Sequence, residues 1–133
     1  MTFEEQLEFG NTHNAFMIHS NIKAVSLDEN TAQVTWEKTP SGLNAMGGVH
    51  GGLLFLMGDC SAGLLARSTG SKFVTLDSNF RYLRDGREAE KLVANASLIK
   101  RGRTVTIVRS VVSVAGTDKV LAEGEFTFFC IDK

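Results

Sequence analysis

The sequence predicts an α+β fold in which an antiparallel sheet of about six strands is wrapped around one long central helix. The helix is expected from Gly51 to about Ser68, where apolar residues point in nearly every direction, as in a helix that is buried on most sides. Most other regular segments alternate apolar and polar residues, as strands with one buried face do. A chain of 133 residues is long enough for one core, so residues 1–133 are expected to form a single domain.

The remaining elements follow from local patterns. Thr2 and Glu5 form a capping-box pattern, which predicts a short N-terminal helix that ends near Gly10. Strands are expected at residues 21–27, 31–37, 72–80, 91–100, 104–114 and 120–130. The fifth strand does not alternate cleanly, because Arg109 interrupts both phases, and it is expected to contain a bulge or to have two covered faces. Residues 39–50 contain the only proline and three glycines and are expected to form a loop.

Composition excludes several classes of protein. A net charge of −1 with 22% charged residues gives no general attraction to nucleic acid or to anionic membranes. No apolar run is long enough to cross a bilayer, and the N-terminus does not resemble a signal peptide. Cys60 and Cys130 form neither a metal-binding spacing nor a disulfide framework, so a reducing cytoplasm, no metal and no bound cofactor are expected.

A candidate for catalysis lies where the loop becomes the helix, at His50, Gly51 and Gly52. The first backbone N–H groups of a helix are unpaired, and two glycines let a ligand approach them closely. These donors and the positive end of the helix dipole suit an oxygen that gains negative charge during a reaction. The alternative is that the glycines only allow tight packing of the helix start.

Asp59 is the second candidate, because it places a carboxylate on an otherwise apolar helix. The alternatives are an aspartate that hydrogen-bonds to nearby backbone and one on a narrow wet strip of the helix. Asp59 follows Gly52 by seven residues, a rise of about 10.5 Å, so it cannot easily attack a carbonyl held at its own helix start. Two chains paired about a two-fold axis would bring the helix start of one to Asp59 of the other, which predicts an obligate dimer.

The run NAMGGVHGGLLFLMGD, residues 44–59, resembles the signature of the hotdog thioesterases of the phenylacetate-degradation type and of their small mammalian relatives. The similarity lies in the spacing of a loop asparagine, the HGG at the helix cap and the helix aspartate. The run TLDSNFRYLR, residues 75–84, is also similar to a strand of that family. With the order of elements, the resemblance covers most of residues 20–130.

The resemblance implies a hotdog fold and the hydrolysis of acyl-CoA, with coenzyme A entering only as part of the substrate. Asp59 would be the nucleophile or the general base, and the N–H groups of Gly51 and Gly52 would polarise the thioester carbonyl. Asn44 and His50 would position the thioester or the water, and Thr75 would orient that water. The family also implies association into homodimers and homotetramers.

The sequence departs from the family pattern at two positions and contains one charged turn of interest. Asp85-Gly86 stands where the family often has a proline, and Gly63 stands where an aryl-CoA subgroup has a threonine. The turn Lys100 to Arg103 could receive the phosphates of coenzyme A, although such charges are more often only a solvated turn. The candidate coenzyme A contacts are Arg101, Gly102, Arg103, Arg81 and Arg84.

The same residues are also compatible with two other functions. The first is a hotdog dehydratase or hydratase that acts on acyl thioesters, with His50 and Asp59 as its acid–base pair. The second is an acyl-CoA-binding protein without catalysis. The sequence does not specify the acyl group.

Overall fold

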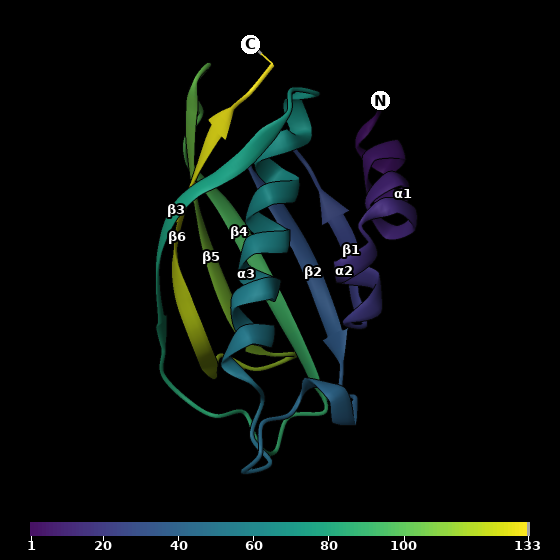
Figure 1. The fold of residues 1–133 in the computed structure, drawn as a ribbon, viewed down its shortest axis with the longest axis vertical. Helices are drawn as coiled ribbons and strands as arrows, with labels where there is room; N and C mark the ends of the chain where they lie inside the picture. The colour runs from purple at the N-terminus through teal and green to yellow at the C-terminus, as the bar shows by residue number, and fades with distance from the viewer. Residues whose placement is uncertain (133) are drawn as a thin grey trace.

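The computed structural model describes residues 1–132 and contains a six-stranded antiparallel sheet that curves around helix α3, Gly51–Ala66 (Figure 1). The strands are β1 (Ile22–Leu27), β2 (Thr31–Glu37), β3 (Phe73–Tyr82), β4 (Lys91–Lys100), β5 (Val105–Val114) and β6 (Val120–Cys130). Their order across the sheet is β1-β2-β4-β5-β6-β3, so β1 and β3 are its edges. The predicted architecture is confirmed. Within residues 1–132, none of the helices combines the length and the apolar character needed to span a bilayer.

Two short helices, α1 (Phe3–His13) and α2 (Ala15–His19), precede the sheet and lie along β1 (Figure 1). The predicted capping box at Thr2 is present. The expectation that the first helix ends near Gly10 was wrong, because a helix tolerates an interior glycine at a cost of about 1 kcal/mol. Asn14 separates the two helices: its N–H donates to the carbonyl of Gly10, and its side chain caps the start of α2.

Helix α1 closes one edge of the sheet with a single amide side chain. Asn11 donates from Nδ2 to the carbonyl of Ala24 at 2.8 Å and accepts the N–H of Ala24 at 2.9 Å. The amide therefore replaces a neighbouring strand at this point of β1. At the other edge, residues 74–79 of β3 are exposed. An exposed edge strand is a template for pairing with another chain.

The segment between β2 and α3 has more structure than the predicted loop. It begins with a 3-10 turn, η1, at Pro40–Gly42, and an isolated bridge joins Leu43 to Val49. The N–H of His50 donates to the carbonyl of Gly42 at 2.9 Å. These backbone contacts, which a search for side-chain periodicity does not detect, hold the start of α3 in place.

The irregularity expected in the fifth strand lies in its neighbours. Val112 and Ser113 of β5 pair with Ala122 and Val120, so the extra residue belongs to β6. Against β4, the register shift likewise leaves the extra residue in β4. Arg109 lies beside Glu123 of β6, with which it forms an ion pair. The expectation of a bulge in β5 was wrong. The strand has one buried and one partly buried face, and its apolar alternation is hidden in the sequence because the polar residues Thr106 and Ser110 occupy buried positions.

The core lies between α3 and the inner face of the sheet. Met57, Ala62 and Leu65 of α3 are fully buried, and they pack among residues of the sheet that include Trp36 and Phe126. Gly58 lets helix α3 approach the sheet closely. A Cβ at that position would lie 2.9 Å from Cζ of Phe126 and 3.0 Å from Cε1 of Phe80.

Gly58→Ala should therefore destabilise the protein, because the added methyl group would displace two packed aromatic rings. We expect a loss of about 1 to 3 kcal/mol in the free energy of unfolding, which denaturant titration measures. Gly10→Ala in α1 is the matched control, since no atom lies within 4 Å of its added Cβ and alanine favours a helix. Equal stability of the two variants would contradict this account of the helix–sheet contact.

Candidate active site

Helix α3 begins at a cap formed by His50. The imidazole Nδ1 accepts a hydrogen bond of 2.8 Å from the N–H of Gly52. The carbonyl of His50 accepts from the N–H groups of Leu53 and Leu54 at 2.9 and 3.2 Å. Because Nδ1 is an acceptor, the neutral ring carries its proton on Nε2. His50 is exposed, so this second nitrogen is available as a donor.

The N–H of Gly51 is the open donor at this helix start. Within residues 1–132 it has no hydrogen-bond partner, whereas the N–H of Gly52 is engaged by His50. An unpaired amide at the positive end of a helix is suited to bind an oxygen that becomes negatively charged. The structure thus separates two glycines that the sequence treats alike.

Asn44 organises the loop before the helix. Its Oδ1 accepts hydrogen bonds from the N–H groups of Met46 and Gly48 at 2.9 and 3.1 Å. Its backbone N–H donates to the carbonyl of Gly48 at 2.8 Å. The Nδ2 group has no hydrogen-bond partner among residues 1–132, so it is free to donate to a ligand.

Asp59 lies on the one face of α3 that the sheet does not cover. It is half-buried, while its neighbours Gly58 and Cys60 are buried. The same stripe of the helix contains Gly52, Phe55, Leu56 and Gly63. The carboxylate is thus at the border of the core and not fully enclosed, closer to the wet strip that the sequence left as an alternative.

Thr75 of β3 holds this carboxylate. Its hydroxyl donates to Oδ1 of Asp59 at 2.7 Å across 16 residues of sequence. The register of β3 against β6 shifts between Thr75 and Asp77, which places a bulge next to the contact. Bulges bend a strand and re-aim its side chains. The hydroxyl occupies Oδ1, and Oδ2 remains available for chemistry.

The two halves of the site are far apart within one chain. Gly51 and Asp59 belong to the same straight helix, and their separation of eight residues corresponds to a rise of about 12 Å. A thioester carbonyl held by the N–H of Gly51 is therefore beyond the reach of Asp59 in the same chain. The structure brings Thr75 to Asp59 and His50 to Gly52, but it does not join these two pairs.

A cavity of about 270 Å³ opens beside the helix start, between α2 and α3. Its lining combines apolar and polar side chains, namely Phe16, His19, Ser20, Ser41, His50, Leu53 and Leu56, with Gly42 and Gly52. A larger cavity of about 590 Å³, between the loop at residues 84–89 and the β5–β6 turn, includes Arg84 but none of the candidate catalytic residues.

Arg101, a candidate for binding coenzyme A, has another role. Its guanidinium donates to the carbonyls of Ala66 and Leu65 at 2.8 and 2.9 Å and to the hydroxyl of Ser68 at 3.2 Å. These carbonyls belong to the last turn of α3, where backbone acceptors lack helical partners. Arg101 therefore caps the end of the helix.

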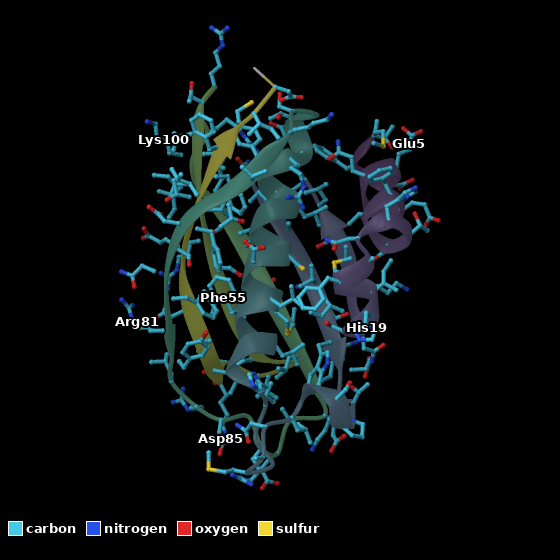
Figure 2. The ribbon with its side chains drawn as sticks, in the orientation of Figure 1. Glu5, His19, Phe55, Arg81, Asp85 and Lys100 are labelled. Atoms are coloured by element: carbon cyan, nitrogen blue, oxygen red, sulfur yellow. The ribbon has the colours of Figure 1, made fainter. Side chains whose placement is uncertain are left out.

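The other candidate cations lie at two ends of the molecule. Arg81 forms an ion pair with Glu123 at 3.6 Å, and Arg84 donates to the carbonyl of Val120 at 2.7 Å. Arg103 is exposed in the β4–β5 turn, beyond Lys100 at the far end of the sheet from Asp85 (Figure 2). Within one chain these groups do not form a single anion site.

Arg67, which was not among the residues predicted from the sequence, lies on the same helix face as Asp59. The guanidinium of Arg67 packs against Gly63, where a Cβ would be 2.9 Å from Nη1. Burial lowers the pKa of Arg67, and the charge of Asp59 partly opposes this effect. The four-residue spacing of Asp59, Gly63 and Arg67 is the sequence signal that could have identified it.

Cys60 is adjacent to Asp59, but its thiol is unreactive. Burial raises the pKa of its thiol to about 12, with a further rise from the charge of Asp59. The thiol is therefore protonated at neutral pH and is not a nucleophile. Among residues 1–132, no three side chains of His, Cys, Asp or Glu are close enough together to hold a metal ion.

Comparison with known proteins identifies the family. A model of the thioesterase superfamily matches residues 46–121, more than half of the chain. The chain belongs to the thioesterase superfamily. The match includes the helix start, Asp59 and Thr75, so the candidate site lies almost wholly inside the superfamily domain; Asn44 precedes it by two residues.

Individual relatives of this superfamily chain agree with the assignment. Human acyl-coenzyme A thioesterase 13 is 30% identical over 86 residues, which are 63% of this chain and 61% of the human protein. A Streptococcus mutans protein solved bound to acetyl-CoA is 33% identical, with a TM-score of 0.76 over 83% of this chain and 88% of that one. Escherichia coli PaaI, from the phenylacetic acid degradation operon, shares the hotdog fold at a TM-score of 0.87 and 22% identity, covering 98% and 96% of the two chains.

The cap at His50 can be tested by stability. His50→Ala removes the acceptor for the N–H of Gly52 and should lower the free energy of unfolding by about 1 kcal/mol. His50→Asn is the matched variant, because asparagine is among the best N-cap residues and should retain most of that stability. Denaturant unfolding of both variants measures the difference, and identical losses would show that the imidazole cap contributes nothing.

Proposed function

We propose that this chain hydrolyses acyl-CoA thioesters in a site shared between two subunits. The observation that carries the proposal is the half-buried carboxylate of Asp59, which Thr75 orients at 2.7 Å on the uncovered face of α3. The human relative, named an acyl-CoA thioesterase, and the Streptococcus mutans relative with bound acetyl-CoA support this choice of substrate.

The roles of the residues follow from their free atoms. The N–H of Gly51 polarises the thioester carbonyl and stabilises the oxyanion. Oδ2 of Asp59 either removes a proton from water, which attacks the carbonyl carbon, or attacks that carbon itself to form an anhydride that water then hydrolyses. In both cases the carbon–sulfur bond breaks and the coenzyme A thiolate leaves. The cavity between α2 and α3 receives the acyl group.

A two-fold dimer would bring the Gly51 amide and the Asp59 carboxylate close together. Of the two sheet edges, β1 is covered by Asn11 of α1, whereas β3 is exposed. Antiparallel pairing of two β3 strands would set the α3 helices side by side in opposite directions. The Gly51 amide of one subunit would then meet Asp59 of the other. The same pairing brings Arg81 and Arg84 of one subunit to the end that carries the partner's Lys100 to Arg103 turn. A tetramer of such dimers remains a prediction of the resemblance.

The contact at His50 disfavours a dehydratase. An acid–base role for His50 needs a ring nitrogen that can accept a proton, but Nδ1 accepts the N–H of Gly52 and Nε2 carries the proton. In this state His50 can orient a substrate by donating from Nε2.

Asp59→Asn should abolish hydrolysis while preserving the fold. The amide can still accept the hydroxyl of Thr75 but provides neither a base nor an anionic nucleophile. We expect kcat to fall by about 10²- to 10⁴-fold, measured as release of free thiol from a panel of short, medium, long and aryl acyl-CoAs. Melting temperature and molecular mass in solution are the controls. If a sample in which every chain carries Asn at position 59 kept its turnover, Asp59 would have no role in the mechanism.

Gly51→Pro tests the backbone donor. Proline lacks the N–H, is favoured at the first position of a helix, and requires an extended residue before it. His50 already has that conformation, with φ −63° and ψ 134°. We expect kcat to fall by about 10²- to 10³-fold. Gly51→Ala is the control, because its Cβ would make an ordinary contact of 3.5 Å with Tyr82 and the N–H remains. Equal activity of both variants would contradict the role of this amide.

Mixing the two inactive variants tests the sharing of the site. A dimer of one Asp59→Asn chain and one Gly51→Pro chain contains one site with both defects and one site with neither. Random re-association of equal amounts should restore about one quarter of wild-type activity. If each site belongs to one chain, the mixture stays inactive.

A further inference from the structure

We propose that Arg67 binds an anionic group of the substrate in the shared site and thereby selects among thioesters. The inference rests on the proposed function and extends it to a residue outside the known signature. The inference is supported by the position of Arg67 on the helix and by its donors, which have no partner among residues 1–132. The proposed dimer then sets where Arg67 would lie beside the partner subunit.

The guanidinium of Arg67 occupies space that a side chain at Gly63 would fill. A Cβ at residue 63 would lie 2.9 Å from Nη1 and 3.1 Å from Nη2 of Arg67. The guanidinium therefore rests on the backbone of α3, one helical turn, or about 6 Å along the axis, from Asp59. Arginine side chains on a helix lean toward its N-terminus, which is the direction of Asp59.

The donors of Arg67 are free. Of the seven arginines in the chain, five have a hydrogen bond or an ion pair to a described residue: Arg81, Arg84, Arg87, Arg101 and Arg109. Within residues 1–132, the Arg67 guanidinium has none; it lies over Gly63, and the residue is exposed. A cationic fork of N–H groups that faces solvent can bind a carboxylate or a phosphate in a bidentate manner.

The proposed dimer places this fork inside the site. If Asp59 faces Gly51 and Gly52 of the partner subunit, antiparallel helices set Arg67, eight residues later, beyond the partner's helix start, on the side of the loop that precedes it and contains Asn44. The Nδ2 group of Asn44 is also unpaired among residues 1–132. The guanidinium of Arg67 and the amide of Asn44 would then offer donors to the same anionic oxygen, although the Asp85 side chain also lies against this loop, at Gly48.

The shared chemistry is an anionic oxygen, and the substrate has two sources of it. One is a carboxylate at the far end of the acyl group, and the other is the phosphate of coenzyme A. Four substrates separate them: pentanoyl and glutaryl thioesters, each on coenzyme A and on pantetheine, which lacks the nucleotide. Pentanoyl and glutaryl have equally long chains and differ in the terminal carboxylate.

The test compares kcat/KM of wild type and Arg67→Gln on these four substrates. A loss of about 10- to 100-fold on both glutaryl substrates alone assigns Arg67 to an acyl carboxylate, and the same loss on both coenzyme A substrates alone assigns it to the phosphates. Arg67→Lys should recover part of either loss. Gly63→Ala, which keeps the charge but displaces the guanidinium, should reproduce the pattern more weakly. Lys23→Gln, at the opposite edge of the sheet, is the charge-removal control.

Two results would overturn the inference. Unchanged kcat/KM on all four substrates would show that Arg67 binds none of them. An equal loss on all four, with the acid limb of the pH profile moved to higher pH, would show that Arg67 acts only through the charge of Asp59. A wild-type protein that hydrolyses none of the four, or Asp59→Asn that hydrolyses them normally, would instead reject the proposed function and with it this inference.

Discussion

Helix α3 is covered by the sheet on every side except one stripe, and the chemistry of the molecule depends on that opening. Close packing at Gly58 draws the helix onto Phe80 and Phe126, so the covered faces are tight. The uncovered stripe carries Asp59, which is half-buried. Thr75 then fixes one carboxylate oxygen and leaves the other. A carboxylate with one occupied and one open oxygen is prepared for proton transfer or attack.

The same rigid helix imposes the second constraint. It holds the open amide at Gly51 and the carboxylate at Asp59 eight residues apart, too far to contact one thioester carbonyl within a single chain. The proposed dimer would bring the amide of one chain to the carboxylate of the other. The two edges of the sheet differ in a way that suits self-association, because α1 blocks β1 with the amide of Asn11 while β3 is exposed.

Two arginines lie at the end of α3 and make different contacts. Arg101 reaches across from the β4–β5 turn and donates to the last carbonyls of the helix, which lack partners of their own. Arg67 follows the last turn and folds back over Gly63, with no hydrogen bond from its guanidinium to any of residues 1–132. Arg101 stabilises the helix end, whereas the proposed role of Arg67 is to bind a ligand. Composition alone does not distinguish them, since both are cations next to the same helix end.

The sequence by itself determined the sheet, the central helix, the capping of α1 and the identity of the helix-start residues. These depend on periodicity and on contacts within a few residues, which are visible in a linear pattern. Only the tertiary structure decided that His50 caps Gly52 and leaves Gly51 open, that Thr75 meets Asp59, that Arg101 caps α3 and that Arg67 lies over Gly63. Each of these depends on the direction of a side chain or on strands distant in sequence, and no residue pattern encodes that direction before the chain has packed.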